Sequence, residues 1–271
     1  MSDYFGLDAT RLKNKKLFLF DMDGTIYKED SLFEGTLDLM SAIKIKGGHY
    51  VFITNNSSKS VIDYVKKLNK MRIEATEDNF FTSSQATAIL LRQKYSKAKV
   101  YCQGTESLLK ELKNFGINVT DKIEDDIGLI LVGFDTELTS EKLRKTCFLL
   151  NKDIPYYATN CDLRCPVGFG YIPDCGSICG MLENCTGRKP IYIGKPGPTM
   201  VSLAMEKYSV TSEETVVIGD RLYTDIATGV NAGVDTICVL TGEATIQSLK
   251  NSIIKPTFVF ASVKEILSEL T

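Results

Sequence analysis

The sequence predicts an α/β protein: a Rossmann-like parallel sheet into which a second, smaller α/β domain is inserted. Short apolar segments alternate with helical periodicity along the whole chain, as in parallel sheets joined by helical crossovers. Polar residues suited to catalysis follow several of these apolar segments, and open α/β sheets bind ligands at the carboxyl ends of their strands. Glycine- and proline-rich stretches in the middle third indicate a loop near the far end of the inserted domain.

The expected boundaries follow from the same periodicity. Strands are expected at residues 17–20, 50–54, 100–102, 127–133, 156–159, 191–194, 215–219, 236–240 and 257–260. Helices are expected at residues 34–46, 60–70, 83–94, 106–115, 140–151, 198–208, 222–232 and 262–270. The inserted domain is expected to span residues 84–180, which leaves residues 1–83 and 181–271 for the catalytic core.

The composition excludes several classes of protein. With 44% apolar and 24% charged residues, the chain of 271 residues is typical of globular proteins. A net charge of −2 argues against a nucleic acid partner, which would favour a basic patch. No apolar run reaches the roughly 18 residues that a membrane span needs, so no membrane partner is expected. The first residues lack the basic and apolar pattern of a signal peptide, and a cytoplasmic location is therefore expected.

Five of the eight cysteines lie in one stretch: Cys161, Cys165, Cys175, Cys179 and Cys185. The two CxxxC pairs could form a metal or redox site, but structural zinc sites usually use shorter CxxC spacings. Free, partly buried thiols are the favoured interpretation. A structural role is favoured for the single histidine, which cannot by itself build a zinc site.

The segment Asp21-Met22-Asp23-Gly24-Thr25 follows the apolar run at residues 17–20. Two carboxylates so close together are costly to bury unless a cation compensates them, and divalent cations prefer oxygen ligands. An aspartate can also attack phosphorus and form an aspartyl-phosphate. The alternative is an aspartate-rich turn between a strand and a helix.

Three further strand ends carry polar residues of the same kind. Thr54, Asn55 and Asn56 suit phosphate oxygens, although they could also cap a helix. Lys195 could neutralise the negative charges of both a phosphate and the attacking carboxylate. Alternatively, it could be an ordinary surface lysine. Asp220 is a candidate cation ligand after a fully apolar strand, and Asp225 could orient Lys195 from the next helix.

The order of these motifs resembles that of the haloacid dehalogenase-like (HAD) superfamily. The resemblance rests on Asp21-x-Asp23-Gly24-Thr25, Thr54-Asn55-Asn56, Lys195-Pro196 and Gly219-Asp220-x-x-x-x-Asp225. The insertion between the second and third motifs corresponds to a C2-type cap. The surrounding residues, with Ala158-Thr159-Asn160-Cys161-Asp162, are similar to the NagD / p-nitrophenyl phosphatase branch.

This resemblance implies a phosphatase that uses Mg²⁺ to hydrolyse small phosphate monoesters, such as nucleotide monophosphates, sugar phosphates or p-nitrophenyl phosphate. Asp21 is then the nucleophile, and Asp23 protonates the leaving alcohol and later activates water. The Asp21 carboxylate, the Asp23 backbone carbonyl and Asp220 would hold the metal. Thr54, Asn55 and Lys195 would hold the phosphoryl oxygens.

Two alternative functions stay open at this point: a phosphotransferase or phosphomutase, and a non-catalytic protein that binds a phosphate ligand on the same scaffold. The cap is expected to select the leaving group. Asn160, Asp162 and Arg164 are the candidate specificity residues, because they follow the last strand expected in the cap, although a hydrogen-bonded turn would explain them equally. An exposed edge strand of the cap could pair with a second copy to form a homodimer.

Overall fold

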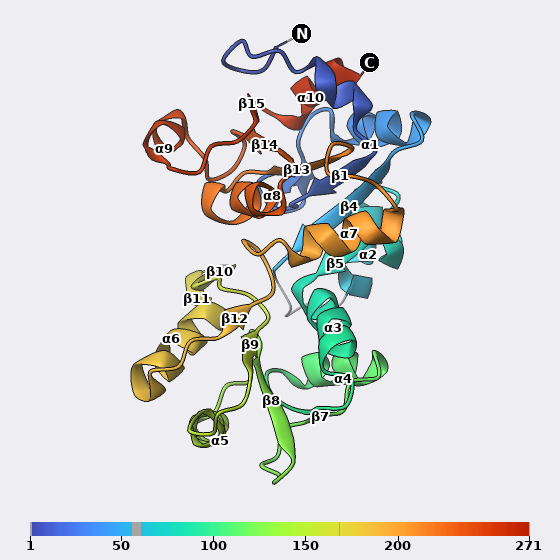
Figure 1. Ribbon diagram of the computed structural model, residues 1–271. Helices are drawn as coiled ribbons and strands as arrows, with labels where there is room; N and C mark the ends of the chain where they lie inside the picture. Colours follow the sequence, from blue (N-terminus) through green and yellow to red (C-terminus); the bar gives the residue numbers. More distant parts are fainter. Residues whose placement is uncertain (1, 56–60, 168, 271) are drawn as a thin grey trace. The chain divides into compact units, whose positions relative to one another are not determined.

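The computed structural model describes residues 2–55, 61–167 and 169–270, and contacts within it divide the chain into two compact units (Figure 1). The first unit consists of residues 2–54, 61–81 and 195–270. The second consists of Asn55 together with the described residues between Thr82 and Gly194. Among the described residues, no helix combines the length and the apolarity that crossing a bilayer would require.

The first unit is built on a six-stranded sheet with the strand order β15-β14-β13-β1-β4-β5. Its strands are β1 (Leu17–Phe20), β4 (His49–Thr54), β5 (Phe80–Thr82), β13 (Thr215–Gly219), β14 (Asp235–Val239) and β15 (Phe258–Phe260). Strand β1 pairs in parallel with both β4 and β13, so the carboxyl ends of these three strands lie at one edge. The residues that follow β1 and β13 are therefore neighbours in space.

Helices cover this sheet, and its central strands β1 and β13 are buried along their whole length. The helices are η1 (Thr10–Asn14), α1 (Thr36–Ile45), α2 (Val61–Lys70), η2 (Glu77–Asn79), α7 (Thr199–Tyr208), the π-helical turn η3 (Leu222–Ile226), α8 (Ala227–Ala232), α9 (Ile246–Asn251) and α10 (Val263–Leu270). The largest apolar cluster joins alternate strand residues such as Phe18 and Phe20 to Leu39 of α1 and Ile266 of α10. Helices α7 and α8 pack instead against β1 and β13.

The second unit has its own parallel sheet, with the order β12-β9-β8-β6-β7. Its strands are β6 (Lys99–Gln103), β7 (Val119–Thr120), β8 (Ile127–Val132), β9 (Tyr156–Ala158) and β12 (Ile191–Tyr192). Its helices are α3 (Ser83–Lys94), α4 (Glu106–Asn114), α5 (Ser140–Leu150) and α6 (Cys175–Thr186). Two short antiparallel hairpins complete the chain: β2 (Tyr27–Lys28) with β3 (Ser31–Leu32) in the first unit, and β10 (Arg164–Val167) with β11 (Gly170–Pro173) in the second.

The predicted α/β class is confirmed, and most expected elements lie within two or three residues of their predicted limits. Three local expectations were wrong. The strand near residue 191 pairs with β9 in the second sheet and lies outside the core sheet. The expected helix at 222–232 begins as the π-helical turn η3. The loop expected at residues 172–176 ends at Asp174, where helix α6 begins, because Asp174 caps its first turn and Ile178 and Leu182 pack into the core of the second unit.

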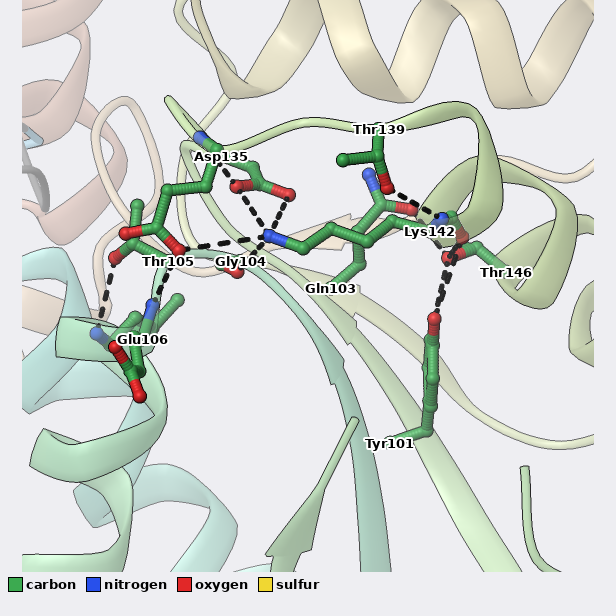
Figure 2. Close-up of polar contacts among 11 residues, drawn as sticks. Tyr101, Gln103, Gly104, Thr105, Glu106, Asp135, Thr139, Lys142 and Thr146 are labelled. Atoms are coloured by element: carbon green, nitrogen blue, oxygen red, sulfur yellow. Dashed lines mark hydrogen bonds and ion pairs between the residues drawn. The ribbon is translucent and has the colours of Figure 1, made fainter. Parts of the chain in front are cut away.

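A buried ion pair joins the carboxyl ends of β6 and β8 in the second unit (Figure 2). The carboxylate of Asp135 is fully buried, and its two oxygens lie 3.0 and 3.1 Å from the amino nitrogen of Lys142. That ammonium also donates to the carbonyl of Gly104 at 2.9 Å, so Lys142 ties helix α5 to both strand ends. A lysine that holds a buried carboxylate contributes more to stability than one in an exposed pair.

We expect Lys142→Met to lower the free energy of unfolding by about 2–4 kcal/mol, because Asp135 would keep its buried charge and lose its partner. The matched control is Lys145→Met on the same helix. Lys145 pairs with Glu141, whose side chain is 76% exposed, so its loss should cost no more than about 0.5 kcal/mol. Urea unfolding of both variants checks this. Equal losses would show that the buried pair contributes no more than the exposed one.

Candidate active site

Asp21 is the first residue after β1, and the parallel pairing of β1 with β13 fixes its backbone. Its N–H donates to the carbonyl of Ile218 at 2.8 Å, which continues the sheet by one more hydrogen bond. The carboxylate is 16% exposed, and Oδ1 accepts a hydrogen bond from the amino group of Lys195 at 2.5 Å. The site therefore contains a partly open carboxylate held against a buried cation.

The Lys195 ammonium bridges two carboxylates. It donates to Asp21 and, at 2.6 Å, to Oδ1 of Asp225, while its own side chain is only 5% exposed. Asp225 lies in the turn η3, and its other oxygen accepts from the backbone N–H of Arg221 at 3.0 Å. Gly219 is required beside it, because a Cβ there would lie 2.2 Å from the Cβ of Asp225. Two neighbouring strand ends thus converge on one lysine.

Asp220 is held from two sides. Thr25 donates its hydroxyl to Oδ1 at 3.3 Å, and the backbone N–H of Glu243 donates to Oδ2 at 2.8 Å. Two glycines make room for this carboxylate: a Cβ on Gly24 would lie 2.7 Å from Oδ2, and one on Gly242 would lie 2.0 Å from it. Gly24 also has a φ of +85°, which disfavours other residues.

The electrostatics of the site follow from burial of like charges. Burial is the main cause that raises the pKa of Asp21, Lys195 opposes the rise, and Asp225 and Asp220 add to it, so that the pKa is about 7. Burial and Asp225 likewise raise the pKa of Asp220 to about 6. Burial alone would lower the pKa of Lys195, but the carboxylates of Asp21 and Asp225 raise it above its ordinary value. Lys195 therefore stays charged, and its single positive charge does not fully compensate the carboxylates around it.

Asp21, Asp220 and Asp225 each offer a carboxylate oxygen, and these oxygens lie within 4.8 Å of one another. Three ionised carboxylates and one ammonium leave a net charge of two negative units. Arg221 compensates part of this charge, because it lowers the pKa of Asp220, while its guanidinium also lies 3.3 Å from the carboxylate of Glu243. Carboxylate oxygens at this separation suit a hard divalent cation, which would balance the remaining charge.

The other residues predicted for the core motifs lie as follows. Asp23 is exposed, and its backbone forms a bridge with Tyr27 at the start of the β2–β3 hairpin. Thr54 is the last residue of β4, the strand beside β1, and is buried. Asn55 belongs to the second unit, where its amide donates to Asp162 at 3.1 Å. Asn56 lies outside the described residues.

The three candidate specificity residues separate into two environments. Asn160 is fully buried and donates to the backbone carbonyl of Asn55 at 3.0 Å, while the N–H of Asp162 donates to the Asn160 side chain at 2.9 Å. Asn55, Asn160 and Asp162 therefore form one hydrogen-bonded group in the second unit. Arg164 is exposed on β10, and its guanidinium carbon lies 4.5 Å from the ring centroid of Tyr171 on β11.

The sequence analysis missed the loop that follows β14. Thr241 donates its hydroxyl to the carbonyl of Gly24 at 2.6 Å, and Gly242 and Glu243 surround the Asp220 carboxylate. The signal was available: a Thr-Gly pair directly follows an apolar segment whose neighbour in the sheet ends at Asp220. The order of strands in the sheet is needed to recognise it.

Two family models match the chain. Residues 18–118 match the model described as haloacid dehalogenase-like hydrolase, and residues 192–266 match the one described as HAD-hydrolase-like. An acid sugar phosphatase of Staphylococcus saprophyticus is 32% identical over 259 residues, which cover 96% of this chain and 99% of that protein. The chain belongs to the haloacid dehalogenase-like hydrolases. This confirms the predicted superfamily.

Comparison with solved structures identifies the group within the superfamily to which this chain belongs. The 4-nitrophenylphosphatase of Thermotoga maritima aligns with a TM-score of 0.90 and 40% identity, over 96% of this chain and 99% of that one. NagD from E. coli K-12 aligns with a TM-score of 0.84 and 32% identity, over 93% and 98%. The chain is thus a NagD-like phosphoric monoester hydrolase, as the motifs indicated. A glycerol phosphate phosphatase of Mycobacterium tuberculosis, solved in complex with magnesium, is 26% identical with a TM-score of 0.87, over 100% and 79%.

The raised pKa of Asp21 makes stability depend on pH when the metal is removed. The ordinary pKa of an aspartate is 3.8, and in the folded hydrolase that of Asp21 is about 7. Between these values the folded state binds more protons than the unfolded state, so this residue makes the protein less stable as the pH rises. Asp21→Asn removes the titration without changing the size of the side chain.

In excess chelator, we therefore expect Asp21→Asn to be as stable as the wild type near pH 4 and more stable near pH 7. The difference should amount to a few kcal/mol at most, since one pKa unit corresponds to about 1.4 kcal/mol. Urea unfolding of both proteins at several pH values measures it. Curves that run parallel from pH 4 to pH 7 would contradict the raised pKa.

Proposed function

We propose that this protein is a Mg²⁺-dependent phosphatase that hydrolyses small phosphate monoesters through an aspartyl-phosphate on Asp21. The observation that carries the proposal is the buried arrangement of Asp21, Lys195, Asp225 and Asp220 at the carboxyl ends of β1 and β13. It contains a nucleophilic carboxylate, a cation for the phosphoryl group and the donor set of a divalent ion. Sugar phosphates and p-nitrophenyl phosphate are the first substrates to consider, because similar proteins are named for them.

The proposed metal ligands are the Asp21 carboxylate, the Asp23 backbone carbonyl and Asp220. The closeness of the Asp21 and Asp220 carboxylates and the room kept by Gly24 and Gly242 support this assignment. Bound Mg²⁺ would polarise the phosphoryl group and reduce its repulsion from the attacking carboxylate. Asp225 stands apart from this set, because both of its oxygens already accept hydrogen bonds, from Lys195 and from the backbone of Arg221.

In the proposed mechanism, an oxygen of Asp21 attacks phosphorus and the ester oxygen leaves. Asp23 gives its proton to that leaving oxygen and then takes one from the water that hydrolyses the aspartyl-phosphate. Its exposure suits the exchange of protons with water. Lys195 favours the ionised form of Asp21 by opposing the rise of its pKa, and Asp225 keeps Lys195 in place.

Thr54 and Asn55 are proposed to bind the phosphoryl oxygens together with Lys195. The role of Thr54 is supported by the β1–β4 pairing, which brings the end of β4 beside Asp21. Asn56 is proposed with them on sequence grounds alone. The second unit is proposed to act as the cap, with Asn160, Asp162 and Arg164 selecting the leaving group. Their position in one loop and the adjoining hairpin supports this role.

The function is tested by phosphate release from a panel that contains p-nitrophenyl phosphate, sugar phosphates and nucleoside monophosphates. We expect turnover with Mg²⁺, loss of turnover in excess chelator and recovery when Mg²⁺ is restored. Asp220→Asn should raise the Mg²⁺ concentration needed for half-maximal rate by about tenfold or more. Full turnover in chelator would refute the metal assignment, and no turnover on any monoester would refute the substrate class.

The nucleophile is tested by Asp21→Asn, assayed with saturating Mg²⁺. An amide has nearly the shape of a carboxylate but is a very poor nucleophile, so we expect the rate to fall by roughly 10³-fold or more. Asp38→Asn is the matched control, because Asp38 is exposed in the first turn of α1 and should leave the rate unchanged. An Asp21→Asn rate within tenfold of the wild type would exclude the covalent intermediate.

A further inference from the structure

A cavity of about 750 Å³ lies in the first unit, at the edge of the core sheet opposite to Asp21. Its lining residues come from four segments that lead into parallel strands: residues 11–16 into β1, Lys46 into β4, residues 212–214 into β13 and residues 233–235 into β14. The four residues of β1, roughly 13 Å of extended chain, lie between this edge and the edge that carries Asp21. The cavity is therefore separate from the proposed catalytic site.

The charged side chains that line this cavity are mainly basic. Positive charges exceed negative ones by two, although the whole chain has a net charge of −2. The basic residues are Arg11, Lys13, Lys15, Lys16 and Lys46, and the acidic residues are Glu213, Glu214 and Asp235. An excess of positive charge around a concave surface attracts anions and raises their local concentration.

Two of the three carboxylates in the cavity wall already have partners on both oxygens. Oδ1 of Asp235 lies 2.6 Å from the guanidinium of Arg11, and Oδ2 lies 2.7 Å from the ammonium of Lys15. Oε1 of Glu214 lies 2.5 Å from the ammonium of Lys16, and Oε2 accepts a hydrogen bond from the N–H of Thr211 at 3.1 Å. These ion pairs hold the wall of the cavity together, and they leave the excess positive charge on other lysines.

Three lysines of the wall retain hydrogen-bond donors for a ligand. The side chain of Lys15 is only 3% exposed, and its ammonium donates to Asp235 and, at 2.6 Å, to the carbonyl of Glu213. An ammonium has three donors, so one of them remains available at the cavity. Lys13 and Lys46 are exposed, and no ion pair or hydrogen bond joins their side chains to any other described residue. The wall thus combines one buried, fixed ammonium with two unpaired ones.

We propose that this cavity binds a small polyphosphate anion, whose phosphate oxygens are held by Lys13, Lys15 and Lys46. Lysine binds phosphate as a point charge, and a chain of phosphates carries several negative charges that can meet ammonium groups from different segments. The volume is within the range of small-molecule sites, so both a free polyphosphate and the triphosphate of a nucleotide fit. This site uses neither Asp21 nor a metal ion, and it is independent of the proposed phosphatase activity.

The test is calorimetric titration of the full-length protein with inorganic tripolyphosphate in excess chelator, so that no metal ion links the anion to the carboxylates around Asp21. We expect binding that weakens as the salt concentration rises, because salt screens the lysine charges. The double variant Lys13→Gln/Lys46→Gln should bind about tenfold more weakly or less, since two of three charged contacts are lost. Lys70→Gln/Lys94→Gln is the matched control: it removes the same charge from the exposed ends of α2 and α3 and should bind like the wild type.

A second titration with ATP, also in chelator, distinguishes the two sources of the phosphate chain. ATP that binds more tightly than tripolyphosphate assigns the site to a nucleotide, and ATP that binds no more tightly assigns it to the free chain. Two results would overturn the proposal. One is the absence of binding to the wild type. The other is equal affinity in Lys13→Gln/Lys46→Gln and in the control, because the anion would then bind elsewhere, for example at Lys195.

Discussion

The interaction on which the site depends is the bridge that Lys195 makes between Asp21 and Asp225. Burying an ammonium is unfavourable unless carboxylates surround it, and burying carboxylates is unfavourable unless a cation compensates them. Here Lys195 compensates the carboxylates of Asp21 and Asp225, and they compensate its ammonium. Asp220 adds a third carboxylate close to this pair. The same arrangement that tolerates these charges in the sheet edge makes the site receptive to a divalent cation.

This charge balance constrains the backbone around it. Gly24, Gly219 and Gly242 have no side chain because carboxylates occupy the space that a Cβ would need. Strands β1, β13 and β14 end at one edge because they pair in parallel, so three turns can each contribute one part of the site. The apolar runs before these turns pack in the core, whereas the residues after them are restricted by direct contact with one another.

The second unit also contains a lysine–carboxylate ion pair at strand ends, but there the pair has a structural role. Its sheet also ends in polar side chains, and the Lys142–Asp135 pair is buried at the ends of β6 and β8. Every strong donor and acceptor of that pair is satisfied within the unit, so it rigidifies the fold without leaving charge for a ligand. Asp21 and Asp220 differ, because burial and neighbouring carboxylates raise their pKa values, as is common at reactive sites.

The sequence by itself determined the α/β class and the hydrolase superfamily, and it predicted two units and the residues of the site. Asp21, Lys195, Asp220 and Asp225 were all predicted from polar residues that follow apolar strands, and the structure joins these four. Only the tertiary structure decided that β12 belongs to the second sheet, that Asn55 bonds to Asp162 and that the loop at Gly242 surrounds Asp220. The reason is physical: a strand end is a local pattern, which periodicity reveals. Strand order and helix packing are contacts between distant segments, which no local pattern encodes.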